Sequence, residues 1–171
     1  MRSMREFFCL SMACVLAGLT PGGDAAAQGR TLDEVVVTAQ KRTENVQDVP
    51  IVVTAISGQL LQDTGVRDIK DLTILTPGLI VTSTANEMST TARIRGVGTV
   101  GDNMGLESSV GIVIDEVYRP RNGVGFGDLG ELERIEVLKG PQGTLFGKNT
   151  SAGVINVRTA APQFDFGGTF E

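Results

Sequence analysis

Two glycine-rich segments contain residue types that bind phosphates in other proteins. The segment 96–101 (GVGTVG) fits the pattern G-x-G-x-x-G, which cradles a dinucleotide where a strand precedes it and a helix follows. The next residues, 102–109, carry no helical apolar stripe and contain the helix breakers Asn103 and Gly105. Gly147-Lys148 lacks both the earlier glycine and the following Ser or Thr of a phosphate loop. The sequence therefore predicts no nucleotide site.

Acidic side chains form two groups with the chemistry for catalysis or metal binding. Glu133 and Glu136 belong to an alternating segment and point to opposite faces by parity. With nearby Glu131 they are expected on a solvated or interface face rather than in an acid–base pair. The second group comprises Asp102, Asn103 and Glu107. Its spacing lacks the regular oxygen pattern of a calcium loop, so we expect no metal site.

Composition narrows the function classes further. The 171 residues include 15 basic and 20 acidic side chains and no His, which excludes Ser-His-Asp catalysis and His-ligated metals. The net charge of −5 argues against a nucleic-acid partner. The length suits one globular domain. We therefore expect no enzyme, no catalytic residue and no cofactor.

The first 27 residues have the organisation of a secretory signal peptide. Arg2 and Arg5 precede an apolar run, 7–19, that is too short to span a bilayer as a helix. The small residues 25–27 (AAA) mark the expected cleavage site. Both cysteines lie inside the apolar run, so the mature chain is expected to carry neither a disulfide nor a thiolate metal site.

Residues 28–48 are predicted to form a flexible extended arm. Its one apolar patch, 35–38 (VVVT), favours an extended backbone because β-branched side chains dominate it. Such a segment can add to the sheet edge of a partner, or it can be an ordinary edge strand of its own domain. The sequence leaves both interpretations open.

Residues 49–162 are predicted to fold as a small α+β domain with a mixed β-sheet, short helices and long glycine-rich loops. Ser57 and Gly65 are suited to cap a helix over 58–63, and Pro77 ends a second helix over 66–75. Alternation predicts that Ile135 and Val137 face a core, as do Ile155 and Val157. The expected strands are 51–56, 79–82, 92–95, 110–114, 117–118, 133–137 and 154–159.

Several motifs, taken in order, resemble the N-terminal part of a TonB-dependent outer-membrane receptor. Segment 32–39 (LDEVVVTA) resembles the TonB box. The plug-like motifs are 49–51 (VPI), 75–79 (LTPGL), 93–96 (RIRG), 132–143 (LERIEVLKGPQG) and 145–157 (LFGKNTSAGVINV). The resemblance covers nearly all of 32–162, and residues 163–171 resemble the opening of a first barrel strand.

The resemblance implies a plug domain in the outer membrane, exposed to the periplasm and enclosed by the receptor's own 22-stranded barrel, which lies outside this sequence. It implies uptake of a scarce ligand, with an iron–siderophore chelate expected. A barrel-less periplasmic plug-like binding module, or a truncated gene product, is the alternative. Only residues 28–31 separate the box from the cleavage site, so no extra signalling domain is expected before the box.

The resemblance also implies roles for individual residues. TonB is expected to bind by strand addition to Asp33, Glu34, Val35, Val36, Val37 and Thr38. Arg95 and Arg134 are expected to dock against carboxylates of the barrel wall, the alternative being exposed strand arginines. Candidate ligand-binding residues are Arg119, Arg121 and Asn103.

One hairpin departs from the family's pattern. Asp115-Glu116 stands where the family usually has Asp-Gly. Glu disfavours a primed two-residue turn because that turn needs positive φ. We therefore expect this hairpin to differ locally.

Overall fold

A computed structural model describes residues 36–39, 41–66, 68–83, 89–99, 106–120, 123 and 130–164. Its centre is a five-stranded mixed sheet, which confirms the predicted α+β class. The strand order is β3 (Val52–Ser57), β8 (Leu132–Lys139), β9 (Gly153–Thr159), β6 (Val110–Ile114) and β7 (Val117–Arg119). Only the β6–β9 pair is parallel.

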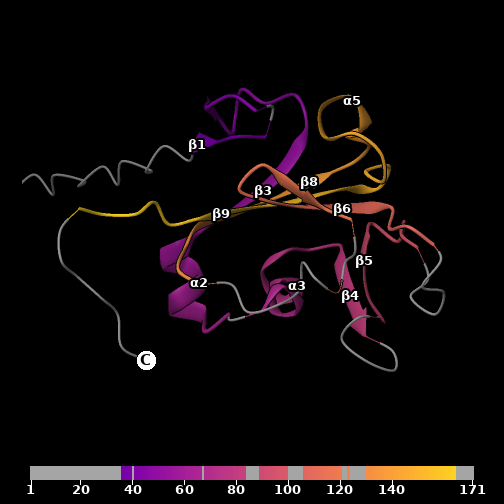
Figure 1. Cartoon of the computed structure of the whole chain (residues 1–171), viewed down its shortest axis with the longest axis horizontal. Coiled ribbons are helices and arrows are strands. Elements are labelled where there is room, and N and C mark those ends of the chain that lie inside the picture. Colours follow the sequence, from indigo (N-terminus) through magenta and orange to yellow (C-terminus); the bar gives the residue numbers. More distant parts are fainter. Residues whose placement is uncertain are drawn as a thin grey trace, which may run out of the picture. The chain divides into compact units, whose positions relative to one another are not determined.

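One face of this sheet is covered by helices and a second small sheet (Figure 1). α2 (Gly58–Thr64) begins as predicted, because the Ser57 hydroxyl accepts the Leu60 N–H at 3.3 Å, and it ends at left-handed Gly65, φ 68°. The other covering elements are η2 (Ile69–Asp71), α3 (Leu72–Leu75), β4 (Leu79–Ser83) and β5 (Thr90–Ile94), the last two paired antiparallel.

The hydrophobic core beneath these elements draws side chains from both β8 and β9. Ile135 and Val137 of β8 and Ile155 and Val157 of β9 all point into it, which confirms the alternation predicted from the sequence. Its other buried members are Ile56, Leu61, Ile69, Leu72, Leu79, Ala92, Ile94, Val110, Ile112 and Ala152.

The opposite face carries the arm. Strands β1 (Val36–Val37) and β2 (Glu44–Asn45) form a ribbon with two residue pairs, and the short helix α5 (Gly143–Phe146) lies over the same face (Figure 1). Val37 and Ala39 are buried there against Val49, Val113, Leu138 and Val154. The described part of the arm is therefore packed, although the sequence predicts a flexible segment.

The arm does not extend the main sheet. Val36–Val37 pairs within the same chain, but with β2 rather than with an edge of the five-stranded sheet. Its β-branched side chains pack on the face of that sheet because Leu138 and Val154 leave an apolar surface there. The sequence could not predict this cover, since the covering residues are distant along the chain.

The hairpin between β6 and β7 corrects one expectation. Asp115 and Glu116 adopt positive φ angles of 47° and 68°, as a primed two-residue turn requires. The Asp115 carboxylate accepts the Thr159 N–H at 3.0 Å and the Thr159 hydroxyl at 2.8 Å. Glu116 pairs with Arg158 at 3.2 Å. These contacts with β9 offset the cost of placing non-glycine residues in the left-handed backbone region, so the turn forms without a glycine.

Among the described residues, no helix combines the length and the apolar character needed to cross a membrane.

Candidate functional site

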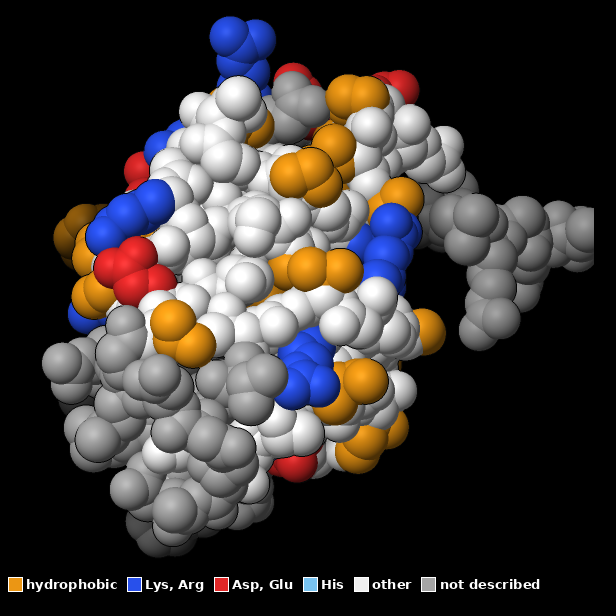
Figure 2. Space-filling model, turned by 90° about the vertical axis from the view of Figure 1, so that its right-hand side faces the viewer, with side chains coloured by type: hydrophobic (Ala, Val, Ile, Leu, Met, Phe, Trp, Pro, Cys, Tyr) orange, Lys and Arg blue, Asp and Glu red, His pale blue; other side chains and the backbone are white. Residues whose placement is uncertain are grey.

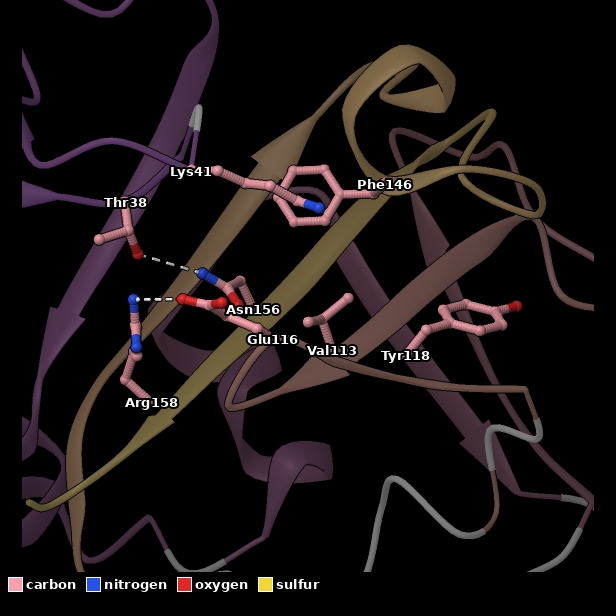
Figure 3. Close-up of a pocket in the computed structure, with 8 residues that line it drawn as sticks. All are labelled: Thr38, Lys41, Val113, Glu116, Tyr118, Phe146, Asn156 and Arg158. Atoms are coloured by element: carbon pink, nitrogen blue, oxygen red, sulfur yellow. Dashed lines mark hydrogen bonds and ion pairs between the residues drawn. The ribbon is translucent and has the colours of Figure 1, made fainter.

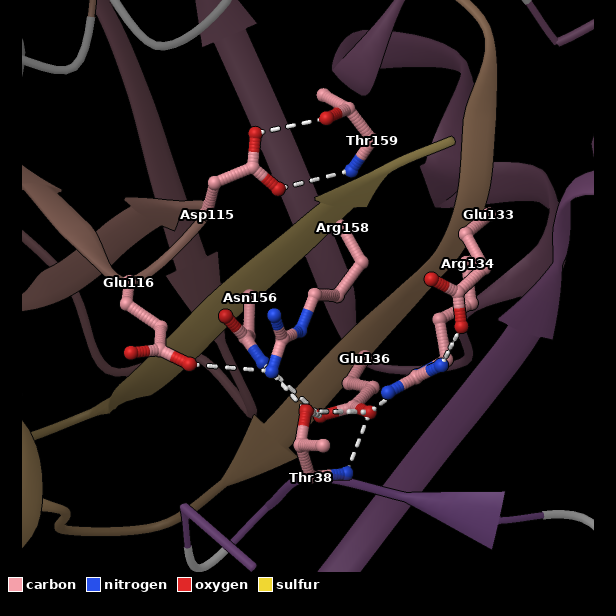
Figure 4. A network of polar contacts seen from close by, with 9 residues as sticks. All are labelled: Thr38, Asp115, Glu116, Glu133, Arg134, Glu136, Asn156, Arg158 and Thr159. Carbon is pink, nitrogen blue, oxygen red and sulfur yellow. Dashed lines mark hydrogen bonds and ion pairs between the residues drawn. The ribbon is translucent and has the colours of Figure 1, made fainter. Parts of the chain in front are cut away.

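The end of the arm is bound to a buried carboxylate on β8. Glu136 Oε1 accepts the Thr38 backbone N–H at 2.7 Å, and the Thr38 hydroxyl lies 3.1 Å and 3.3 Å from its two oxygens. Asn156 Nδ2, on the neighbouring strand β9, donates to Glu136 Oε2 at 3.0 Å and lies 3.4 Å from the Thr38 hydroxyl. We call Thr38, Glu136, Asn156 and Arg134 the arm latch (Figure 4).

Arg134 supplies the positive charge of the arm latch. Its Nε donates to Glu136 Oε1 at 2.8 Å, and a terminal guanidinium nitrogen pairs with Glu133 (Figure 4). Glu136 is fully buried, whereas Glu133 is half exposed at its side chain. A buried carboxylate requires such donors, because an unpaired charge in a low-dielectric interior is costly.

The burial of Glu136 corrects the expectation of a solvated or interface face, because the chain's own arm covers this carboxylate. Its 0% exposure results from the arm, which covers the face of β8 opposite Ile135 and Val137. A signal was present in the sequence: Leu138 shares the parity of Glu136, as Val154 shares that of Asn156. Apolar residues at both parities indicate a strand that is buried on both faces.

A cavity of about 150 Å³ lies beside the arm latch (Figure 3). Its wall combines arm residues with residues of the sheet and α5: Thr38, Lys41, Val113, Glu116, Tyr118, Phe146, Asn156 and Arg158. The ammonium group of Lys41 lies 5.7 Å from the centre of the Phe146 ring, a cation–π distance. The arm is therefore incompletely packed next to Thr38.

Arg95 lies on a different part of the surface. It occupies a two-residue turn with Gly96, φ 53° and 80°, and donates its backbone N–H to Gly78 O at 2.7 Å. Its side chain is exposed and has no carboxylate partner among the described residues. Burial, together with the nearby Arg95 charge, lowers the pKa of Lys139, whose ammonium donates to Pro77 O at 2.8 Å. Arg95 and Lys139 form a cationic corner.

Of the remaining predicted site residues, the structure describes Arg119, Val36, Val37 and Thr38. Arg119 is half-buried on β7, and its Nε is buried without a hydrogen-bond partner in the described part of the chain. Asn103 and Arg121 lie outside the described residues, as do Asp33, Glu34 and Val35 of the predicted box. Val36 is 37% exposed, and Val37 and Thr38 are buried.

Glu107, one of the acidic loop residues considered and rejected as a cation site, is bound to neighbouring side chains. Its carboxylate accepts Lys148 Nζ at 2.9 Å and Asn149 Nδ2 at 2.7 Å. These hydrogen bonds, the one from Lys148 first, lower the pKa of Glu107, and the same contact raises the pKa of Lys148. Within the described ranges, no cluster of three acidic, His or Cys side chains is arranged to hold a metal ion.

Exposed apolar side chains also occur outside the arm region. Figure 2 shows hydrophobic side chains in several separate groups on one face, with Lys and Arg side chains among them. The large exposed ones include Val52, Ile74, Ile80, Val97, Leu106 and Val117.

Comparison with known proteins identifies this fold. The family model of the TonB-dependent receptor plug domain matches residues 45–154. The pesticin receptor of Yersinia pestis is 33% identical over 151 residues, which cover 86% of this chain and 22% of that protein. The vitamin B12 transporter BtuB of Vibrio vulnificus is 32% identical over 163 residues, covering 93% of this chain and 25% of that protein.

A solved structure agrees with these matches. The ferric yersiniabactin uptake receptor FyuA of Yersinia pestis superposes with a TM-score of 0.60 at 31% identity, covering 66% of this chain and 17% of that one. The chain thus spans about a quarter or less of the relatives that it matches. The family model alone covers more than half of this sequence, and the fold described above superposes on a part of FyuA. This chain belongs to the TonB-dependent receptor plug domain family.

Proposed function

We propose that residues 49–162 are the plug of an outer-membrane receptor that imports a ferric siderophore complex, and that residues 28–48 are its periplasmic arm. FyuA, a ferric yersiniabactin uptake receptor, supports the choice of ligand. A signal peptide over residues 1–27 fits export to that compartment. TonB and a surrounding barrel are the proposed protein partners.

The geometry of β1 is the observation that carries this proposal. The strand pairs with β2 over two residues only, lies outside the main sheet, and leaves Val36 37% exposed. An isolated ribbon of that size has little stability of its own. A periplasmic partner can therefore exchange it for a longer strand pairing, in which main-chain hydrogen bonds supply the affinity.

Two further contacts follow from the proposal. The cationic corner, Arg95 with Lys139, presents positive charge that suits carboxylates of a barrel wall. Arg134 is a second docking group, although in this chain it is bound to Glu133 and Glu136. Arg119, whose Nε has no hydrogen-bond partner among the described residues, remains a proposed ligand contact, as do Arg121 and Asn103.

The arm is tested by titrating the full chain with the C-terminal domain of TonB. Val36→Pro removes one backbone donor at a half-exposed position, so we expect at least about tenfold weaker binding. Val36→Thr is the matched control, because it keeps the N–H and the β-branched shape, and its affinity should stay within about twofold. Equal affinities for the two variants would contradict strand addition.

The location and the ligand need a cellular experiment. Cells expressing the gene that carries this sequence are fractionated and probed with an antibody to residues 49–162, and the uptake of ferric yersiniabactin and of vitamin B12 is measured. We expect the antigen in the outer membrane and TonB-dependent iron uptake. An antigen confined to the periplasm would contradict the receptor proposal, and B12 uptake alone would contradict the siderophore.

A further inference from the structure

We propose that Glu136 and Arg134 are positioning residues that hold the arm in its docked state, and that withdrawing Arg134 from Glu136 releases it. The inference rests on the proposed function, because it assigns the control of the same arm. It concerns the hold itself, which the chain exerts without any partner.

The contact on Thr38 competes directly with strand addition. The Thr38 N–H is a backbone donor at the end of the predicted box, and Glu136 occupies it at 2.7 Å. A partner strand that pairs along Val36 to Thr38 needs the donors of that segment. In the docked arm the Thr38 N–H is therefore unavailable to a partner strand until its hydrogen bond to Glu136 breaks.

The other contacts of the arm near Thr38 are limited. β1 contributes two residue pairs with β2, and the cavity of about 150 Å³ removes packing on one side of Thr38. Val37 and Ala39 are fully buried, so they supply an apolar component. The donors at Glu136 add to this apolar packing a directed polar hold on Thr38.

Arg134 connects this hold to the surface. Its side chain is 18% exposed, and it divides its guanidinium between buried Glu136 and half-exposed Glu133. Among the described residues, it is the one cation paired with Glu136. If a carboxylate of another protein segment forms an ion pair with Arg134 in place of Glu136, Glu136 retains only hydrogen bonds from the uncharged donors of Thr38 and Asn156. A buried charge left without its ion partner is strongly unfavourable, and opening of the arm relieves it by admitting water.

Hydrogen exchange of the Thr38 amide in the full chain measures arm opening. Arg134→Gln should increase the exchange rate at Thr38 by about tenfold or more. Arg158→Gln is the matched control, because Arg158 is the cross-strand partner of Arg134 but pairs with Glu116. In that control the rate should stay within about twofold.

A double-mutant cycle separates the proposed coupling from general destabilisation. In a Glu136→Gln background the buried charge is gone, so adding Arg134→Gln should change the Thr38 rate by less than about twofold. Amides of β9 report global unfolding and should remain protected in every variant. Equal rates for Arg134→Gln and the parent, or additive effects in the cycle, would overturn the proposal.

TonB binding gives an independent readout. If the Thr38 rates respond as expected but no variant binds TonB, the arm latch stands and the proposed function fails. If TonB binds the parent and Arg134→Gln with the same affinity and the Thr38 rates do not change, the proposed function stands and the arm latch fails.

Discussion

The two faces of the central sheet are closed by different chemistry. On one face, α2, η2, α3, β4 and β5 cover the larger apolar cluster. On the other, the arm covers a smaller apolar cluster whose neighbour is the arm latch, with a fully buried carboxylate. Figure 1 shows the two covers on opposite sides of the sheet.

This difference bears on reversibility. Separating the apolar face exposes many side chains at once, so it amounts to global unfolding. The arm buries few residues and is held partly by hydrogen bonds that water can replace, so it can open locally. A domain built in this way can keep its sheet intact while one segment becomes available to a partner.

The largest expected effect comes from the same deletion made on each face. Val137 and Val37 are both fully buried, and replacement by Ala removes two methyl groups from each. Val137→Ala should lower the free energy of unfolding by about 2 kcal/mol and accelerate amide exchange in β9. Val37→Ala should act mainly on the arm and accelerate exchange at Thr38 most. Residue-resolved hydrogen exchange measures both.

One result would contradict the independent opening of the two faces. If both valine variants accelerate exchange at Thr38 and in β9 by the same factor, the arm opens only when the whole domain unfolds. The two faces would then be a single cooperative unit.

A loss of stability of intermediate size is expected from substitutions in the β6–β7 turn, which test whether polar contacts hold this part of the domain. Asp115→Ala loses two hydrogen bonds to Thr159 and should cost about 1–2 kcal/mol in thermal or chemical unfolding. Glu116→Gly relieves the strain of a non-glycine residue at positive φ but loses a surface ion pair with Arg158. The free energy of unfolding should therefore change by less than about 1 kcal/mol. A larger loss for Glu116→Gly than for Asp115→Ala would show that the ion pair, not the Asp115 carboxylate, holds the turn.

The smallest effect is expected from an exposed ion pair, in contrast to the buried one of the arm latch. Lys148 and Asn149 lower the pKa of Glu107, so their contact stabilises the fold above the ordinary carboxyl pKa of 4.5. That contribution is lost as the pH falls through the lowered value. An NMR titration should show the pKa of Glu107 moving back toward 4.5 in Lys148→Gln. An unchanged midpoint in that variant would contradict the assignment.

Local signals predicted the apolar face correctly. Ser57 and Gly65 end α2 as expected, because caps act through backbone groups within a few residues. The alternation of Ile135 with Val137 and of Ile155 with Val157 predicted the core, because the period of a strand is a property of the strand itself.

The second face was predicted less well. Glu136 was expected on a solvated or interface face, but the chain's own arm buries it. Nothing near it in the sequence specifies the donors that bind it, since Thr38 is 98 positions away. The Asp115-Glu116 turn was expected to deviate, but its stabilising partners, Arg158 and Thr159, come from a strand more than 40 positions later. Both errors arise from long-range polar contacts.

The sequence by itself determined most strands of the central sheet, the caps of α2, the apolar face of the sheet and the family, because these depend on local residue types and on the order of motifs. It did not predict β2 or α5, and the single helix expected over 66–75 is η2 followed by α3. Only the tertiary structure decided that the arm folds back, that β1 and β2 lie over a second face, and that Glu136 is buried beneath Thr38. The physical reason is that a buried charge is tolerated only where donors from distant segments converge, and that convergence exists only in the folded chain.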